Sequence, residues 1–171
     1  MRLIVKAESH DAEQIAALVN VAYRGEVSKQ GWTTEAHLLD GCRTTAEDVL
    51  RLITGEGSMF LLFKDEGELI GTVHLKRQAE QAYLSMLAVS PLWQGRGIGK
   101  QLLAAAELTA QQSWNVSKWV MDVVSCRHEL IAFYQRRGYR RTGISQTFPL
   151  NPELWSAKVN GLRLELLEKS L

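Results

Sequence analysis

The sequence has little cysteine, and it has no excess of charge of either sign. Its two cysteines, Cys42 and Cys126, form no Cys-x-x-Cys pair and have no histidine at the spacing of metal ligands. We expect two reduced thiols and no bound metal. Twenty Lys and Arg against nineteen Asp and Glu give a formal net charge of +1. The general positive field that favours binding to phosphate backbones is therefore missing, and nucleic acid is not an expected partner.

Long apolar runs are also missing. Those at 59–63 and 102–106 are among the longest, and they are far shorter than the roughly 20 residues that cross a bilayer. We expect no membrane span and no membrane partner. The first residues, 1–6, read as a short strand, because they lack the apolar stretch and the small-residue cleavage site of a secretory signal. We therefore expect a cytoplasmic protein.

The residues that are present have the composition of a globular domain. Of the 171 residues, 46% are hydrophobic and 23% are charged. Folding a chain of this length buries roughly 70% of its unfolded surface, so a core can form without disulfides or a structural metal. No linker, repeat or low-complexity segment divides the chain. We expect one domain over residues 1–171.

Hydrophobic periodicity and capping residues predict the order of helices and strands. The predicted helices cover about residues 10–23, a short stretch from a capping box at 44–47 to Gly55, a long segment that begins within 94–100, and about 128–137. The predicted strands cover residues 1–6, 59–63, 69–75, 82–89, 118–124, 139–144 and 162–167. We expect an α+β fold with a mixed central sheet flanked by helices.

The most informative stretch is the glycine-rich turn Gln94-Gly95-Arg96-Gly97-Ile98-Gly99-Lys100, which joins a central strand to the long helix. Glycines let backbone N–H groups approach a ligand closely, and the free amides and dipole of a helix start favour an anion such as pyrophosphate. A Walker loop would need Gly-Lys-Ser/Thr after a four-residue gap, and a dinucleotide fingerprint would need a third glycine where Lys100 stands. Both spacings are absent.

The spacing Gln94-x-x-Gly97-x-Gly99 resembles the pyrophosphate loop of the GNAT acyltransferases. The resemblance covers nearly the whole chain, because the predicted elements follow the family's order and a helix with Phe133-Tyr134 comes after the loop. It implies the GNAT fold, in which a splayed pair of central strands binds coenzyme A. It also implies an enzyme that uses acetyl-CoA as co-substrate.

The resemblance also implies which residues contact the cofactor. In the family, the amides of the turn hold the pyrophosphate, and the pantetheine arm runs along the central strand at a bulge, where a backbone N–H polarises the thioester carbonyl. The residues carried over are Leu87, Ala88, Val89, Gln94, Gly95, Arg96, Gly97, Ile98, Gly99 and Lys100. Where the family commonly has an Asn that contacts the cofactor arm, this chain has Arg127, which would reach a phosphate or the substrate, or face solvent.

The resemblance gives Tyr134 the role of the acid that protonates the departing thiolate. A thiolate with a pKa of about 8.5 leaves more easily when a phenol with a pKa of about 10 donates a hydrogen bond to it. Only about one lysine-like amine in two thousand is neutral at pH 7, so a base would help the acceptor. The candidates are His74, Glu80 and Glu35, and no spacing singles one out. Positioning alone also accelerates transfer, so a dedicated base can be dispensable.

The segment 30–41 mixes aromatic, acidic and hydroxyl side chains where the family's helices usually wall the acceptor pocket. Loops between rigid elements commonly carry specificity. We expect Trp32 and Glu35 to contact a small cationic or amine substrate, and the alternative is a loop with Trp32 in the core. The arginines within 136–141 form a basic run that we interpret as a solvated face, with a cofactor or RNA contact as the alternative.

The expected function is transfer of an acetyl group from acetyl-CoA to a primary amine of a small molecule or peptide, directly within a ternary complex. Cys126 is not the expected nucleophile, because only its neighbour His128 is placed near it by sequence. One alternative is a sensor that binds acyl-CoA without turnover, and another is an acetyltransferase that modifies a protein or tRNA. The resemblance also leaves a homodimer open, with Trp155 and residues 162–167 pairing between subunits.

Overall fold

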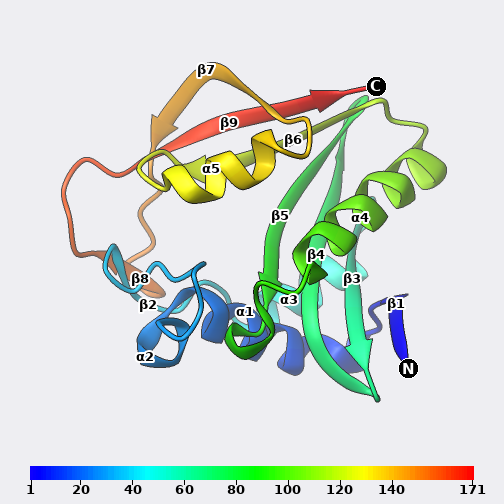
Figure 1. Cartoon of the computed structure of the whole chain (residues 1–171), viewed down its shortest axis with the longest axis horizontal. Coiled ribbons are helices and arrows are strands. Elements are labelled where there is room, and N and C mark those ends of the chain that lie inside the picture. The colour runs from blue at the N-terminus through cyan, green and yellow to red at the C-terminus, as the bar shows by residue number, and fades with distance from the viewer.

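The computed structural model describes all 171 residues, and Figure 1 shows their arrangement. The strands are β1 (Arg2–Lys6), β2 (Leu39–Gly41), β3 (Ser58–Asp65), β4 (Glu68–Gln78), β5 (Gln81–Val89), β6 (Lys118–Val124), β7 (Arg140–Thr147), β8 (Trp155–Ala157) and β9 (Arg163–Ser170). The helices are α1 (Ala12–Tyr23), α2 (Gly25–Ser28), α3 (Ala46–Thr54), α4 (Ile98–Trp114) and α5 (His128–Gln135), with short 3-10 helices at Ser9–Asp11 and Pro91–Trp93. None of these helices has the length and apolar character needed to span a membrane.

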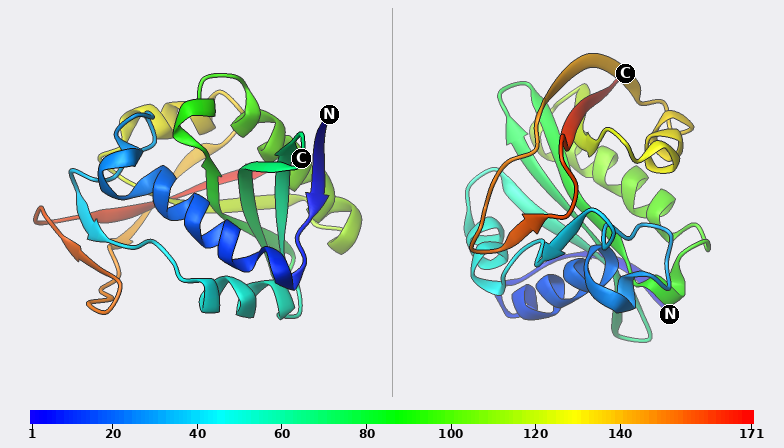
Figure 2. Two further views of the ribbon diagram at one scale, coloured as in Figure 1. Left: turned by 90° about the horizontal axis from the view of Figure 1, so that it is seen from below. Right: turned by 90° about the vertical axis from the view of Figure 1, so that its left-hand side faces the viewer.

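Seven of the strands form one mixed sheet in the order β1-β3-β4-β5-β6-β9-β7, and β2 pairs with β8 in a separate two-stranded sheet. Neighbouring strands are antiparallel except β5 and β6, which run parallel. Helices α1 and α3 cover one face, and α4 and α5 lie on the other (Figure 2). The predicted α+β fold, a mixed sheet between helices, is confirmed.

Each face of the sheet has its own core. On one face, Ile15 of α1 packs in a cluster with Phe60 of β3, and both side chains are fully buried. On the other face, α4 lies so close to β4 that a Cβ added to Gly71 would be 2.8 Å from Leu102 Cδ1. Burying side chains of this size stabilises the fold by roughly 1.5–3 kcal/mol each. Close packing therefore fixes α4, and with it the glycine-rich turn that precedes the helix.

The two central strands separate after a short paired stretch. Only Ala82 with Trp119 and Tyr83 with Val120 pair between β5 and β6, and beyond them the strands diverge (Figure 1). The register between β4 and β5 shifts between Thr72 and His74, where the facing residue Met86 has a φ of +50°. Such a bulge bends the strand. The edge of β5 that faces β6 therefore has no partner strand over residues 84–89.

The structure departs from the sequence predictions where pairing is long-range. Periodicity does not predict β2 and β8, because each has three residues and its partner lies far along the chain. The strand predicted over 69–75 extends to Gln78, and the helix predicted over 128–137 ends at Gln135. Residues 163–167 belong to β9, which has β6 on one edge and β7 on the other, so they offer no free strand edge to a second subunit. The homodimer itself stays a prediction.

Candidate active site

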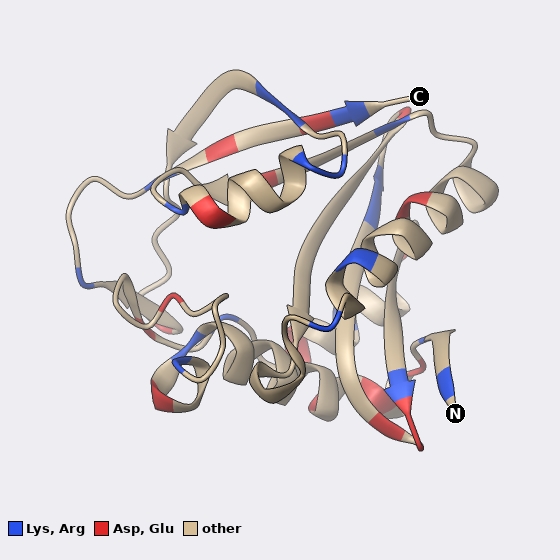
Figure 3. Ribbon diagram, viewed as in Figure 1, with Lys and Arg blue, Asp and Glu red and all other residues tan.

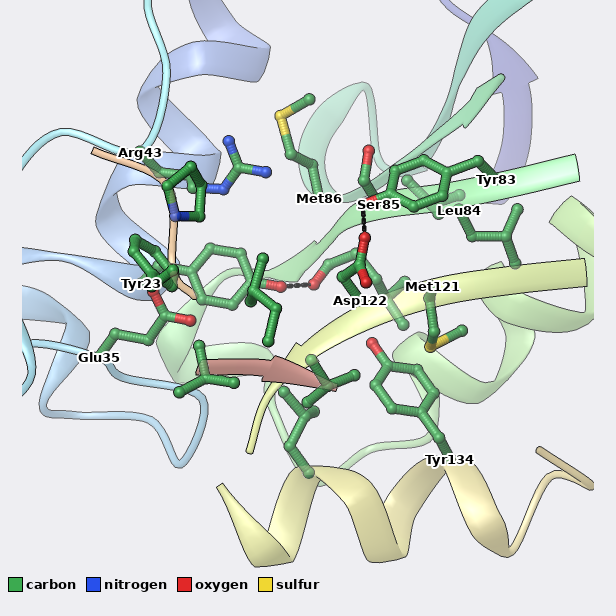
Figure 4. Close-up of a pocket in the computed structure, with 18 of the residues that line it drawn as sticks. Tyr23, Glu35, Arg43, Tyr83, Leu84, Ser85, Met86, Met121, Asp122 and Tyr134 are labelled. Atoms are coloured by element: carbon green, nitrogen blue, oxygen red, sulfur yellow. Dashed lines mark hydrogen bonds between the residues drawn. The ribbon is translucent and has the colours of Figure 1, made fainter. Parts of the chain in front are cut away.

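Two cavities meet between the diverging strands. The inner cavity, of about 240 Å³, lies between β5, β6, the C-terminal end of α1 and residues 148–155 (Figure 4). The glycine-turn cleft, of about 330 Å³, runs along residues 93–100 and α5. Leu87, Leu130 and Tyr134 line both cavities. Molecules bound in the two cavities would therefore meet beside these three side chains.

The glycine-turn cleft exposes backbone amides. Gly97 is the N-cap of α4, its φ is +79°, and no side chain caps the helix. The first amides of α4 therefore have no intrahelical partner, and the helix dipole makes this end positive. Gly95 has a φ of +78°, and a Cβ added there would meet no atom within 4 Å. An anion can thus approach the backbone of the turn closely.

Three cationic side chains also line the cleft: Lys100, Arg136 and Arg137. The Arg137 guanidinium lies 4.2 Å from the ring centroid of Phe133, and its Nη1 donates a hydrogen bond of 3.2 Å to the Phe133 carbonyl. Its Nε is buried and has no hydrogen-bond partner. An unpaired buried donor beside free amides is a suitable partner for a phosphate oxygen. The basic run is thus not uniformly a solvated face.

The other two arginines of the basic run, Arg140 and Arg141, lie outside the cleft. Arg141 donates to Glu165 at 2.6 and 2.7 Å, and Arg140 pairs with Glu168. Figure 3 shows basic residues of β7 beside acidic residues of the neighbouring strand β9. These ion pairs neutralise the outer half of the run, which is exposed and lies outside the cleft.

Gln94 joins the glycine turn to the loop after α2. Its Oε1 accepts a hydrogen bond of 2.7 Å from the Trp32 amide, and its Nε2 donates to Thr33 Oγ1 at 2.8 Å and to the Val89 carbonyl at 2.9 Å. A Cβ added to Gly31 would lie 2.4 Å from the same Oε1. The side chain of Gln94 therefore holds the loop in place, and these contacts occupy both of its polar atoms.

Trp32 lies in the glycine-turn cleft and not in the inner cavity. Its ring centroid is 5.8 Å from that of Phe133, and the side chain is 39% exposed. It is therefore neither in the core nor on the acceptor wall where the sequence interpretation placed it. The hydrogen bond from its amide to Gln94 explains this position, because it fixes the backbone beside the turn.

Tyr134 projects from α5 to the point where the cavities meet (Figure 4). Its side chain is buried, and no hydrogen bond joins its hydroxyl to the other residues drawn in Figure 4. Burial, followed by the nearby Tyr23, raises the pKa of Tyr134 well above its ordinary value. The hydroxyl is therefore protonated at neutral pH and is free to donate a hydrogen bond to a bound group.

Tyr23 supports β5 just after its bulge. Its hydroxyl donates to the carbonyl of Leu87, which helps to hold the bent strand in place. Burial, and next the negative charge of Glu35, raises the pKa of Tyr23 to about 12. Sequence analysis did not select Tyr23, because one tyrosine at the end of a helix carries no local signal.

Glu35 lines the inner cavity, but its charge is already balanced. Arg24 Nη2 lies 3.3 Å from Glu35 Oε2, and Arg127 Nη1 lies 3.3 Å from Oε1. All three side chains are buried. Arg127 lines neither cavity, so in the structure it holds Glu35 and does not face the cofactor cleft or solvent. Glu35 as a base, or as a partner for a cationic substrate, would have to compete with two guanidinium groups.

Asp122 is the other carboxylate of the inner cavity, and the sequence analysis missed it. It lies on β6 and accepts a hydrogen bond of 2.9 Å from the Tyr83 hydroxyl, and it has no ion-pair partner. Figure 4 shows Asp122 beside Tyr83 and on the same side of the cavity as Tyr134. The available signal was one acidic residue inside the otherwise apolar run from Trp119 to Val124.

His74 and Glu80 line neither cavity. His74 is buried in the sheet, where its Nε2 lies 2.8 Å from Ser58 Oγ and its Nδ1 lies 2.9 Å from Ser85 Oγ. Burial, and then the charge of Lys76, lowers the pKa of His74 to about 4. Glu80 is exposed in the turn between β4 and β5. Neither side chain therefore lines a cavity, although Ser85, the partner of His74 Nδ1, lines the inner one.

The predicted cofactor residues divide into two groups. Those that line the glycine-turn cleft are Leu87, Val89, Gln94, Gly95, Gly97, Ile98, Gly99 and Lys100. Ala88 points to the opposite core because successive strand residues alternate. The guanidinium of Arg96 lies 4.8 Å from the Trp93 ring centroid, outside the cleft lining. Both cysteines are exposed, and neither lines a cavity.

Comparison with known proteins decides the family. The model of the acetyltransferase (GNAT) family matches residues 14–139. The chain belongs to the GNAT acetyltransferase family. Members of this family are enzymes that use acetyl-CoA as co-substrate. The match ends before β7, so the C-terminal part of the inner cavity lies outside the segment that the family model describes.

Solved structures share the fold at low sequence identity. A ribosomal-protein-alanine N-acetyltransferase from Brucella melitensis has 21% identity and a TM-score of 0.72 over 99% of both chains. A GNAT-family acetyltransferase from Streptococcus pneumoniae has 20% identity and a TM-score of 0.71 over 100% of this chain and 99% of that one. A spermidine N-acetyltransferase chimera from Vibrio cholerae and hSSAT has 16% identity and a TM-score of 0.70 over 99% of this chain and 95% of that one. A comparison with curated proteins found no similar sequence.

Proposed function

We propose that the chain transfers an acetyl group from acetyl-CoA to a primary amine, with the cofactor in the glycine-turn cleft and the acceptor in the inner cavity. The observation that carries this proposal is the meeting of the two cavities at Leu87 and Tyr134. An amine entering from one side can reach a thioester presented from the other. This arrangement favours direct transfer in a ternary complex, since no reactive nucleophile of the protein lies between the cavities. The residues that line the inner cavity come from segments spread between Tyr23 and Leu164, which supports one domain as the acting unit.

The residues of the cleft fit acetyl-CoA. The open backbone at Gly95 and Gly97 leaves room that a Cβ would occupy, and Arg137 Nε is a buried donor without a partner. The amides of 97–100, together with Lys100 and Arg136, would hold the phosphates, and Trp32 would contact the cofactor from the loop. When bound, acetyl-CoA supplies the acetyl group as a thioester.

The reaction converts an ammonium group and the thioester into an amide, a free thiol and one released proton. The new C–N bond forms as the C–S bond breaks, and the sulfur leaves with a proton. Tyr134 is suited to supply a hydrogen bond or that proton at the sulfur, because its hydroxyl is protonated and placed at the junction. This contribution is of the order of 10²-fold.

Asp122 is suited to take the proton that the acceptor loses. It is the cavity carboxylate without an arginine partner, and its place near Tyr134 puts it on the side of the cavity where transfer would occur (Figure 4). A carboxylate also stabilises the bound ammonium before transfer, directly or through water. Asp122 is therefore the proposed base for the acceptor amine, in place of His74 and Glu80.

The test measures binding and turnover separately. Titration calorimetry should show acetyl-CoA binding, and a thiol-release assay over a panel of primary amines should show turnover. Tyr134→Phe should keep the affinity for acetyl-CoA and lower kcat by the order of 10²-fold. Binding without turnover on any amine would support the sensor alternative. Absence of any binding of acetyl-CoA would reject both functions.

A further inference from the structure

We propose that the acceptor is a small primary amine that also carries a carboxylate, and that Arg43 binds this carboxylate in the inner cavity. The inference rests on the proposed function and narrows its substrate class. It follows from the distribution of charge within the cavity, which differs between its two sides.

Arg43 is a cation without a partner in the protein. It lines the inner cavity, it is half-buried, and its guanidinium makes no ion pair or hydrogen bond. Only its backbone amide is bonded, to Asn20 Oδ1 at 2.7 Å. Figure 4 shows its guanidinium directed toward the cavity near Met86. Because a partly desolvated charge is costly unless it is paired, the position favours an anionic ligand.

The groups around Arg43 add to the positive charge. Arg24 and Arg127 flank Glu35 at 3.3 Å, so three guanidinium groups and one carboxylate leave an excess of two positive charges on this side. A second cationic group on the acceptor, as in a polyamine, would be repelled here.

A carboxylate lines the other side of the same cavity. In Figure 4, Asp122 lies with Tyr83 and Tyr134 to the right of Arg43, Tyr23 and Glu35. An ammonium group is stabilised beside Asp122, where the amine must lie to react, and a carboxylate is stabilised beside Arg43. Guanidinium groups bind carboxylates in a bidentate manner. A molecule that carries both charges matches the two sides at once.

The walls of the cavity restrict the size of the acceptor. Phe148, Pro149 and Trp155 form part of its wall from the segment after β7, and the Arg24 guanidinium lies 5.8 Å from the Trp155 ring centroid. Its volume of about 240 Å³ is below the roughly 300–1,000 Å³ of pockets for drug-sized ligands. The size and the apolar walls fit an amino acid with an aliphatic or aromatic part better than a long peptide.

The experiment compares amines that differ only in the carboxylate. The first set of probes is leucine, leucinamide and isoamylamine, and the second is β-alanine and its amide. Putrescine is added because it carries a second ammonium group where the amino acids carry a carboxylate. We expect kcat/KM to be highest for the carboxylate member of each set. Arg43→Gln should raise KM for that member by roughly 10- to 100-fold and leave the amides unchanged. Arg77→Gln is the control, because Arg77 is exposed and lines neither cavity.

A second variant separates loss of binding from misfolding. Arg43→Glu should reverse the preference, so that putrescine gains and leucine loses, which a misfolded chain would not show. Equal kcat/KM for carboxylates and amides in the parent chain would overturn the inference while leaving the proposed function intact. Calorimetry with leucine in the absence of acetyl-CoA gives a readout without turnover. Leucine binding that depends on Arg43, without acetyl transfer to any amine, would uphold the inference and reject the proposed function. If the chain neither binds leucine nor transfers an acetyl group, the inference and the proposed function are both rejected.

Discussion

Replacing Gly97 by alanine tests whether the amides of the turn hold an anion. Gly97 has a φ of +79° and a ψ of 7°, a left-handed conformation that costs an L-residue roughly 1–2 kcal/mol. The added Cβ would meet no protein atom closer than Gln101 Nε2, at 4.0 Å, so backbone strain is the main cost to the free chain. We expect the free energy of unfolding to fall by about 1 kcal/mol, which lowers Tm by roughly 2–4 °C in a chain of this size.

Gly143 provides the matched control. Its φ is +81°, a Cβ added there meets no atom within 4 Å, and it lies on β7 away from both cavities. Gly143→Ala therefore carries the same strain without placing a methyl group in the cleft. Urea denaturation should give similar losses for the two variants.

Affinity for acetyl-CoA should separate the two variants. The methyl group of Gly97→Ala lies where the phosphates must approach the backbone, so we expect Kd to rise at least tenfold, or about 1.4 kcal/mol. Gly143→Ala should keep the parent Kd in titration calorimetry. If the two variants bind acetyl-CoA equally well, the turn does not hold the phosphates and the assignment of the cleft fails.

Three further predictions concern the loop, the buried histidine and the base. Gly31→Ala should displace the Gln94 side chain, which would lie 2.4 Å from the new Cβ, and lower the free energy of unfolding by about 1 kcal/mol. In a Gln94→Ala background, urea denaturation should show almost no further loss from Gly31→Ala, and fully additive losses for the two substitutions would contradict this. The pKa of His74 is lowered to about 4 in the fold from about 6.5 in the unfolded chain, so unfolding takes up a proton between these pH values. The free energy of unfolding should therefore fall by up to about 3 kcal/mol as the pH drops from 6.5 to 4. An identical decline in His74→Gln would show that other groups cause it. Asp122→Asn should lower kcat/KM at pH 7, with a deficit that shrinks as the pH approaches the acceptor's pKa of about 10, because the amine is then already neutral; a deficit independent of pH would exclude Asp122 as the base.

Local patterns in the sequence account for most of the scaffold. The periodicity of α1, α3 and α4 and the hairpin of β3 and β4 depend on neighbours within a few residues, so the elements were predictable. The glycine turn was predictable for the same reason, since its conformation and the free amides of α4 are properties of one short segment. The resemblance to the GNAT family added the splay of β5 and β6.

Side-chain partners within the site could not be predicted in this way. Gln94 turns toward the loop at 31–33, and Glu35 lies between two arginines, one of them Arg127, 92 residues away in the sequence. Hydrogen bonds and ion pairs over such separations depend on how distant elements pack, and a sequence pattern carries no record of them. His74 illustrates the same limit, because its burial between two serines is decided by the pairing of three strands.

The sequence by itself therefore determined the α+β scaffold, the glycine-rich turn and the position of Tyr134 on the helix after β6. Only the tertiary structure decided that Tyr134 lies where the two cavities meet, that Asp122 and Arg43 line the same one of them, and that the segment after β7 contributes to its wall. The physical reason is that secondary structure follows from contacts along the chain, whereas a binding cavity is formed by residues that folding alone brings together.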